Sequence, residues 1–595
     1  MFKCKQLLRR ICVVSYVFLL CGGLVNASNL VSKTNTLIGT QGNGWASGYL
    51  YPGATYPFGM VQFTPTYFTK QLGFVINQLS GAGCDHMGNF PTLPIAGALR
   101  VSPDSILNMQ TPVGKEIGTA GYYAATVDHS IRAELTVTER TGMARYTFSS
   151  KEKQGTVIIG GGVAATSIQV AAIKITGPHS CEGYAEGGAF CGIPTPYKVY
   201  FVAEFDADAE SFGTWKEERL HANHTFAEGS HSGVYFTFPL KEGNQAVQYK
   251  IGVSYVSVEN ARENLRVENP AWDFSAVRQA TQDKWNEYLG KIEVEGDNED
   301  RQMQFYTHLY RSLIHPNVCS DVNGEYMGAD SQVHKTARKF YTSFSNWDTY
   351  RTQTALIAML APEETSDIVM SHYLFAEQSG GGFPRWVLAN IETGVMQGDP
   401  TPILVANAYA FGARNYDPRT LLRTMRYGAE VPGANSQGVL TRPGLEQYLE
   451  KGYYDASILL EYTSSDFAIG RFALQACNDE PVCNWYTQRA MNWKNLFNKE
   501  TGWLQSRNED GSWKRYDADW RESTYKNYFW MVPYDLQGLI DSIGGKEAAE
   551  KRLDEMFRRL DASYGDEWFA SGNEPSFQIP WIYNWAGAPY KAQQV

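Results

Sequence analysis

Two stretches in the first half of the chain, residues 197–205 and 247–255, place apolar side chains at every second position. This period is typical of half-buried strands, because successive side chains of a strand point to opposite faces of the sheet. Glycine-rich breaks at residues 160–162 and 187–188 separate the strand-like segments. We therefore predict an N-terminal antiparallel β-sandwich domain over residues 28–265.

The pattern changes after Asn269, where a proline interrupts the chain and Asp273 is a suitable N-cap for a helix. From Phe274 onward, apolar residues recur at helical spacing. Helical stretches are predicted at 367–377, 403–413, 418–427, 466–477 and 546–560. Because loops rich in glycine and aromatic residues join them, we predict a helical linker at 266–299 and an (α/α)6 toroid barrel over 300–595.

The first residues are typical of an export signal. Basic residues precede a short apolar segment, and Val25-Asn-Ala27 matches the small-x-small cleavage pattern. We predict a signal peptide at residues 1–27 and a periplasmic or secreted protein, with a lipid anchor at Cys21 as the alternative. No later segment has an apolar run long enough to span a membrane.

Six cysteines follow the predicted leader. In an exported protein, cysteines that lie close together in the sequence are candidates for disulfides. We predict the pairs Cys181–Cys191 and Cys477–Cys483, and no metal binding by cysteine, since neither spacing is CxxC.

Composition excludes one broad class of function. The 595 residues carry a net charge of -11, which argues against a nucleic-acid partner because such proteins present a basic surface. The 15 tryptophans, 36 tyrosines and 29 phenylalanines suit carbohydrate binding, but also large cores. We expect a monomer.

Acidic residues lie among aromatic residues near the C-terminus. Glu522 falls within the aromatic run 520–530, and Glu574 follows about fifty residues later. Aromatic rings can stack on the apolar faces of a pyranose while carboxyl groups transfer protons. This set predicts a sugar-cleaving pocket, with an aromatic core as the alternative for any single residue.

Nine motifs in chain order carry a family resemblance. They are Pro52-Gly-Ala-Thr-Tyr-Pro-Phe-Gly-Met-Val-Gln62, Ala133-Glu-Leu-Thr-Val-Thr-Glu-Arg140, His315-Pro-Asn-Val-Cys-Ser-Asp321, Ser345-Asn-Trp-Asp-Thr-Tyr-Arg351, Gly382-Phe-Pro-Arg-Trp386, Gly398-Asp399, Val532-Pro-Tyr-Asp535, Gly572-Asn-Glu-Pro-Ser576 and Tyr583-Asn-Trp-Ala-Gly587. As a set they resemble the calcium-dependent exo-α-mannosidases of glycoside hydrolase family ninety-two. The resemblance covers nearly the whole chain after the leader.

The resemblance implies a β-sandwich packed on an (α/α)6 barrel, and removal of terminal α-mannose from a glycan or mannan with inversion. It also implies a Ca²⁺ cofactor that contacts the 2- and 3-hydroxyls of mannose, as suits a hard cation with oxygen ligands. An inverting enzyme holds its acid and base roughly 6.5–9.5 Å apart, which leaves room for a water molecule.

Site residues follow from matched motifs. Glu522 matches the general acid, and a carboxylic acid among rings has its pKa raised by desolvation. Trp347 and Asp348 match a pair that forms a wall and accepts hydrogen bonds from sugar hydroxyls. The alternatives are a solvated acid for Glu522 and, for Asp348, the cap of a helix starting at Thr349.

Other matched residues belong to loops around the same site. Arg385, Trp386, Asp399 and Glu574 match substrate-binding positions; for Arg385 and Asp399 the alternatives are a structural salt bridge and a turn aspartate. Ca²⁺ ligands are expected at Asn527, Asn573 and Glu574.

The chain also departs from the family pattern. Histidines of the family are replaced at Tyr534 and at Phe577-Gln578. Two further family histidines are absent from the stretch 73–81. Asn573 stands where relatives selective for α-1,2 bonds carry histidine, so the linkage stays open. The family continues beyond this C-terminus with the catalytic base and the last barrel helices. We therefore expect an incomplete barrel without its base. A non-catalytic or truncated glycan-binding protein and another α-glycosidase are the alternatives.

Overall fold

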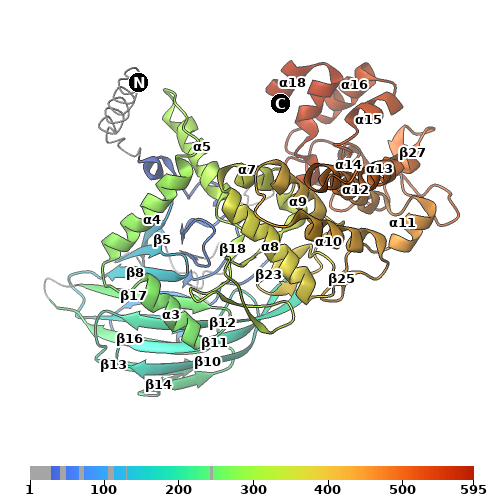
Figure 1. Cartoon of the computed structure of the whole chain (residues 1–595). Coiled ribbons are helices and arrows are strands. Elements are labelled where there is room, and N and C mark those ends of the chain that lie inside the picture. Colours follow the sequence, from blue (N-terminus) through green and yellow to red (C-terminus); the bar gives the residue numbers. More distant parts are fainter. Residues whose placement is uncertain (1–28, 41–48, 66–72, 105–112, 129, 242–244) are drawn as a thin grey trace, which may run out of the picture.

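The computed structural model describes residues 29–40, 49–65, 73–104, 113–128, 130–241 and 245–595. The predicted signal peptide and Cys21 lie outside these residues. Within the described ranges, no helix combines the length and apolar character needed to cross a membrane. The N-terminal part is built of β-sheets and the C-terminal part of helices (Figure 1).

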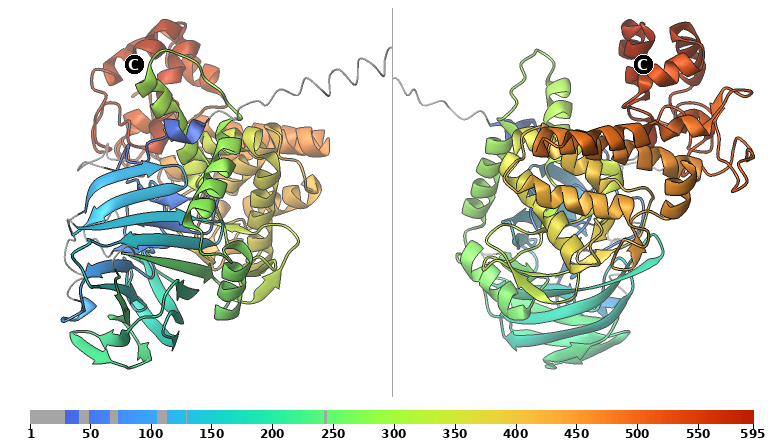
Figure 2. Two further views of the ribbon diagram at one scale, coloured as in Figure 1. Left: turned by 90° about the vertical axis from the view of Figure 1, so that its left-hand side faces the viewer. Right: turned by 45° about the vertical axis from the view of Figure 1, so that its right-hand side comes forward.

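Two antiparallel sheets stack as layers, with helices on one side (Figure 2). Among the described residues, the first sheet contains eight strands in the order β1 (Ala54–Thr55), β2 (Gln62–Pro65), β3 (Phe74–Val75), β4 (Thr92–Ala96), β9 (Gln154–Gly160), β16 (Ser232–Pro239), β13 (Ser211–Lys216) and β14 (Arg219–Ala222). The second contains, in the same ranges, nine strands in the order β15 (Phe226–Glu228), β10 (Ile168–Gly177), β11 (Ser180–Phe190), β12 (Ile193–Phe205), β17 (Ala246–Ser254), β8 (Thr141–Thr147), β7 (Ile131–Val137), β6 (Tyr122–Val127) and β5 (Val113–Thr119).

The alternation seen in the sequence directs side chains into the sandwich core. In β12, Tyr197, Val199 and Phe201 are buried against the other sheet, and burying each contributes about 1.5–3 kcal/mol. The opposite face of this sheet is covered by α3 (Val258–Glu268), which packs Ala261 and Leu265 against it. The predicted sandwich is confirmed.

Three helices connect the sandwich to the rest: α3, α4 (Phe274–Leu289) and α5 (Glu299–Ser312). The boundary expected at residue 265 falls inside α3. Asp273 caps α4 as predicted, since its carboxylate accepts a hydrogen bond from the backbone N–H of Ala276 at 3.0 Å.

The helical region follows, as the resemblance implied. Its helices are α6 (Asn346–Thr349), α7 (Gln353–Leu360), α8 (Pro362–Gln378), α9 (Thr401–Ala410), α10 (Pro418–Glu430), α11 (Leu445–Lys451), α12 (Ala456–Cys477), α13 (Glu480–Ala490), α14 (Tyr525–Tyr528), α15 (Leu536–Ser542), α16 (Lys546–Met556), α17 (Tyr583–Ala586) and α18 (Pro589–Gln594). Short strands lie between them: β18 (Asn317–Val318), β19 (Glu325–Met327), β20 (Val333–Lys335), β21 (Tyr341–Thr342), β22 (Phe344–Ser345), β23 (Trp386–Leu388), β24 (Ile391–Glu392), β25 (Asn435–Ser436), β26 (Val439–Leu440), β27 (Phe497–Asn498) and β28 (Trp503–Leu504). The 3-10 turns are η1 (Leu30–Lys33), η2 (Met491–Leu496), η3 (Glu574–Ser576) and η4 (Ile579–Ile582).

A buried ionic network ties α12 to its surroundings. Asp466 accepts hydrogen bonds from Arg442 at 2.7 Å, Arg489 at 2.5 Å and Tyr448 at 2.6 Å, and Arg442 also contacts Asp399 at 2.8 Å. Burial alone would raise the pKa of Asp466, but Arg489 and Arg442 outweigh it and hold this pKa below its usual value. Every charge in the network therefore has an opposite partner, as burial requires.

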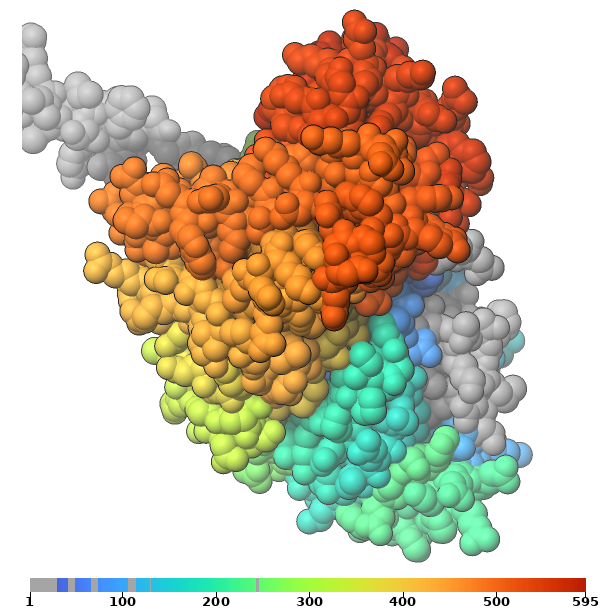
Figure 3. All heavy atoms as spheres, turned by 90° about the vertical axis from the view of Figure 1, so that its right-hand side faces the viewer, coloured from blue at the N-terminus to red at the C-terminus, as the bar shows by residue number. Residues whose placement is uncertain are grey.

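The two parts of the chain share apolar core. Cys319, Tyr326, Phe340 and Trp386 of the C-terminal part belong to the same buried cluster as the sandwich residues. Figure 3 shows the teal part of the sandwich in direct contact with the helical region.

Both predicted disulfides are wrong. Cys84 pairs instead with Cys191, whereas Cys181, Cys477 and Cys483 are unpaired. Cys181 lies at the far end of β11 from the hairpin turn that carries Cys191, and ten residues of extended strand separate two residues by about 30 Å. Closeness in sequence was therefore misleading in a β-hairpin.

Candidate functional site

Asp348 lies in α6 and is half-buried. Ser345 donates a hydrogen bond to its carboxylate, and Trp386 pairs with Ser345 on the neighbouring strand. Burial raises the pKa of Asp348 to about 6, with Glu522 adding to the rise, while Ser345, Arg351 and Trp386 oppose it. Asp348 does not cap a helix, because α6 begins at Asn346 and its N-cap is Ser345.

Glu522 lies in the loop before α14 and has a left-handed backbone conformation, with φ of 48°. Such a conformation is unfavourable for glutamate, and strained residues of this kind cluster at functional sites. The side chain of Asn573 donates a hydrogen bond to its carbonyl group. The carboxyl group is half-buried, and burial raises its pKa against the opposing charge of Arg521.

Glu574 begins η3 and is also half-buried. Burial raises its pKa to about 7, the negative charges of Asp348 and Glu522 contribute, and Arg351 opposes the rise. Three segments far apart in the sequence thus bring Asp348, Glu522 and Glu574 into one electrostatically coupled cluster. We call these three residues the carboxylate cluster.

A buried ion pair between Arg351 and Glu461 lies beside the carboxylate cluster. Arg351 donates hydrogen bonds to the carboxylate of Glu461 and to the carbonyl of Trp347, both at 3.1 Å. The Glu461 carboxylate also accepts from the indole of Trp347 at 3.0 Å and from the hydroxyls of Tyr350 at 3.1 Å and Tyr528 at 3.4 Å. This arrangement fixes the guanidinium and keeps its positive charge near Asp348. Sequence reasoning missed Arg351 and Glu461 as members of the site.

Trp347 is fully buried, and its predicted role as a wall against the sugar stays a prediction. Its side chain is 0% exposed, and Arg351 covers its ring at 4.6 Å. Trp386 is 5% exposed and stacks on Phe190, and its indole lowers the pKa of Asp348.

Tyr564, which the motifs did not indicate, lies near the carboxylate cluster, and Tyr49 lies near Tyr564. Burial raises the pKa of Tyr564, and the charges of Glu522 and Glu574 and the nearby Tyr49 add to the rise. Tyr49 is 39% exposed and comes from the N-terminal part, whereas Tyr564 is half-buried. No sequence motif marked either tyrosine, because only the packing of the two parts brings Tyr49 to Tyr564.

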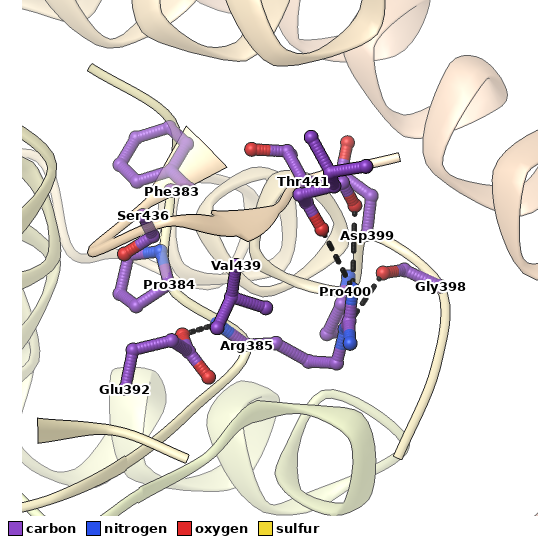
Figure 4. A pocket seen from close by; sticks show the side chains of 11 residues that line it. Phe383, Pro384, Arg385, Glu392, Gly398, Asp399, Pro400, Ser436, Val439 and Thr441 are labelled. Atoms are coloured by element: carbon purple, nitrogen blue, oxygen red, sulfur yellow. Dashed lines mark hydrogen bonds between the residues drawn. The ribbon is translucent and has the colours of Figure 1, made fainter. Parts of the chain in front are cut away.

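Arg385 and Asp399 hold loops together. The Arg385 guanidinium donates to the carbonyls of Gly398 at 3.0 Å and Thr441 at 3.4 Å (Figure 4), and Asp399 pairs with Arg442. The cavity beside them measures about 10 Å³, which admits about one water molecule and no sugar. Their predicted places in the sugar site stay predictions, and the contacts found are hydrogen bonds to carbonyl groups for Arg385 and an ion pair for Asp399.

The two candidate asparagines differ in what surrounds them. The Asn527 amide donates to the carbonyl of Trp568 at 2.8 Å and accepts from Ala570 N–H at 3.4 Å and the hydroxyl of Ser576 at 3.3 Å. Its side chain is 0% exposed and its amide is engaged in these three contacts, and its role as a metal ligand stays a prediction. Asn573 instead precedes Glu574 in the chain, and its side-chain amide donates to the backbone carbonyl of Glu522.

Acidic side chains supply only some of the oxygen ligands that a cation would need beside Asn573 and Glu574. Among the described residues, no group of three His, Cys, Asp or Glu side chains lies close enough to hold a metal ion. Asn573 and Glu574 nevertheless offer oxygen donors, which Ca²⁺ prefers. Because the charged form of Glu574 is strongly disfavoured, a divalent cation would supply charge that its surroundings lack.

A sandwich packed on a helical region, with half-buried carboxyl groups of raised pKa, suits the acid chemistry of a glycoside hydrolase. Comparison with known families agrees. The model of the glycosyl hydrolase family 92 N-terminal domain matches residues 34–254, and that of the family 92 catalytic domain matches residues 260–595. The chain belongs to glycoside hydrolase family 92.

Solved structures and a curated relative give the same result. The family 92 α-mannosidase BT3965 of Bacteroides thetaiotaomicron is 26% identical, with a TM-score of 0.86 over 95% of this chain and 79% of its own. The inverting mannosidase BT2199 of the same organism is 25% identical, with a TM-score of 0.84 over 95% and 81%. An uncharacterized secreted glycosidase of Arthroderma benhamiae is 25% identical over 94% of this chain and 77% of its own.

Proposed function

We propose that this chain is an exported exo-α-mannosidase that removes terminal α-linked mannose with inversion at the anomeric carbon and uses Ca²⁺. The carboxylate cluster carries the proposal, because three coupled carboxyl groups with raised pKa values suit acid catalysis and the binding of sugar hydroxyls. The similarity to an inverting mannosidase and to an α-mannosidase solved with mannoimidazole supports the choice of mannose.

Glu522 is the general acid in this proposal. A raised pKa keeps its carboxyl group protonated closer to neutral pH, so that it can donate a proton to the glycosidic oxygen as the bond breaks. The strained backbone and the hydrogen bond from Asn573 hold its position. An inverting mechanism also needs a base roughly 6.5–9.5 Å from the acid, and we assign none of the described residues to that role.

Asp348 accepts hydrogen bonds from sugar hydroxyls, with Arg351 behind it to stabilise its charged form. Tyr49 and Tyr564 offer aromatic rings for the apolar faces of the sugar. Each contact orients the sugar before the proton is transferred.

Ca²⁺ would be held by the side chains of Asn573 and Glu574, with water and sugar hydroxyls completing its shell. When bound, it polarises those hydroxyls and fixes the orientation of the ring. Cation binding would shift Glu574 towards its charged form, since a nearby positive charge lowers a carboxyl pKa.

Export rests on the N-terminal sequence, whose basic residues and apolar segment are typical of a signal peptide. The relative from Arthroderma benhamiae, which is described as secreted, supports it.

Hydrolysis of α-linked mannobioses tests the proposal. We expect cleavage with Ca²⁺, loss of cleavage with a chelator, and β-mannose as the first product in proton NMR spectra, because inversion converts an α bond to a β anomer. Glu522→Gln should lower kcat by about 10²–10⁴-fold, while the exposed Glu228→Gln should leave it unchanged. Mannose binding without cleavage of any linkage would show a glycan-binding protein, and first release of α-mannose would refute inversion.

A further inference from the structure

A hairpin of the sandwich reaches the helical region at the tip of β11 and β12. Phe190 ends β11 and pairs with Ile193 across a tight turn made by Cys191 and Gly192. Both turn residues have positive φ, 50° and 79°, as expected of a hairpin turn of this length. The tip is therefore a defined structure that holds Phe190 in one orientation.

Phe190 lies between rings from both parts of the chain. It stacks on Trp386 with ring centres 4.2 Å apart and planes at 28°, and it meets His86 edge-on at 6.1 Å. Phe190 and Trp386 are only 3% and 5% exposed, so the contact is tightly packed. Offset stacked pairs contribute beyond their buried area and fix the angle between the rings.

The Cys84–Cys191 disulfide joins the tip to the loop that carries His86. His86 accepts a hydrogen bond from Leu79 N–H at 2.8 Å, and its other ring nitrogen donates to the carbonyl of Cys84 at 2.7 Å. Because both nitrogens are engaged, the His86 ring has a fixed orientation. Phe190 is thus held through the disulfide and through the ring beside it.

On the side of Trp386 away from Phe190 lies the carboxylate cluster. Trp386 pairs with Ser345 across β22 and β23, Ser345 donates a hydrogen bond to Asp348 of the carboxylate cluster, and the Trp386 indole acts on the same carboxylate by lowering its pKa. We propose that Phe190, held by the Cys84–Cys191 disulfide, is a positioning residue that sets the Trp386 indole against Asp348 and so sets sugar affinity. The proposal rests on the proposed function for its meaning in catalysis, although the packing can be tested without it.

The disulfide is open to reagents. Cys191 is exposed and Cys84 half-buried, beside an open hollow of about 450 Å³. A dithiol such as dithiothreitol would supply two electrons and two protons, giving two thiols while it becomes a cyclic disulfide. Reduction would free the tip from the His86 loop, and Trp386 would lose its fixed direction towards Asp348.

Kinetics separate positioning from folding. In Phe190→Ala and in Cys84→Ser/Cys191→Ser, we expect KM for α-mannobiose to rise about tenfold, the effect of weakening about one hydrogen bond, with kcat within about threefold. Phe190→Tyr keeps the ring and should restore the KM. Dithiothreitol should raise the KM of the wild type but not that of the double variant, and Cys477→Ser, at an unpaired cysteine, is the matched control. Wild-type KM in both folded variants, or Phe190→Tyr as impaired as Phe190→Ala, would overturn the proposal.

A readout without catalysis keeps this test separate from the proposed function. With 5-fluorotryptophan incorporated, the fluorine resonance missing in Trp386→Phe identifies Trp386. We expect that resonance to move on reduction and in Phe190→Ala, whether or not the protein cleaves mannosides. A resonance that stays in place in a folded protein would refute the positioning role, whereas a moving resonance without any mannoside cleavage would refute only the proposed function.

Discussion

Replacing Glu574 by glutamine should make the metal-free protein more stable at alkaline pH. The folded protein gives Glu574 a pKa of about 7, against 4.5 for the free side chain. At about 1.4 kcal/mol for each pH unit, ionising this residue in the fold costs about 3 kcal/mol. Because the pKa of Glu574 is raised in the folded protein, its protonated form favours folding. That contribution to the unfolding free energy is fully present below about pH 4.5 and is lost as the pH rises through about 7.

Urea unfolding in a chelator at pH 5 and pH 8 measures the effect. From pH 5 to pH 8 the wild type should lose up to about 3 kcal/mol more of its unfolding free energy than Glu574→Gln does. Glu228→Gln, at an exposed position, should follow the wild type. Ca²⁺ at pH 8 should stabilise the wild type more than Glu574→Gln. The reasoning fails if Glu574→Gln shows the wild-type pH dependence or is the less stable protein at pH 8.

Three further changes have expected outcomes. Asp466→Asn breaks the buried ionic network and should lower the unfolding free energy by about 3–5 kcal/mol; a loss below about 1 kcal/mol in urea unfolding would contradict the role of the network. Asn527→Ala should destabilise by about 1–3 kcal/mol without weakening Ca²⁺ binding in calorimetry, and weaker binding would support its role as a ligand. Trp347→Phe removes one donor to Glu461 and should cost about 1–3 kcal/mol, with little change in KM; a large rise in KM would place Trp347 in the sugar site.

Periodicity predicted the elements well and their ends less well. The stretch 418–427 lies within α10, whose N-cap is Asp417, and 247–255 is displaced by one residue from β17, which runs from Ala246 to Ser254. The helix predicted at 403–413 ends three residues earlier, because the chain turns at Gly412 with φ of 125°. Apolar spacing continues past such a turn, so it does not mark where the backbone leaves the helix.

The motifs indicated three carboxylates that the fold brings together, but they did not predict the contacts of every residue within them. Asp348, Glu522 and Glu574 come together, whereas Arg385 and Asp399, which come from equally recognisable motifs, hold loops in place. A motif records that a residue type is required, and both a ligand contact and a loop contact can require it. Only the distances distinguish the two cases.

Contacts between distant segments could not be predicted from spacing. Tyr49 comes near Tyr564, and Cys84 meets Cys191 across 107 residues. The first contact depends on how the sandwich packs on the helical region, and the second on how a loop and a hairpin of the sandwich meet. The sequence contains no local pattern that records such packing.

The apolar cluster that contains both Phe190 and Trp386 makes the two family domains one thermodynamic unit. Because Tyr326, Phe340 and Leu388 of the catalytic segment pack into the core of the sandwich, neither segment can unfold without exposing the apolar surface of the other. Residues 260–595 expressed alone would therefore expose an apolar surface that promotes aggregation. What evolution combines as two modules, thermal unfolding should report as a single cooperative transition.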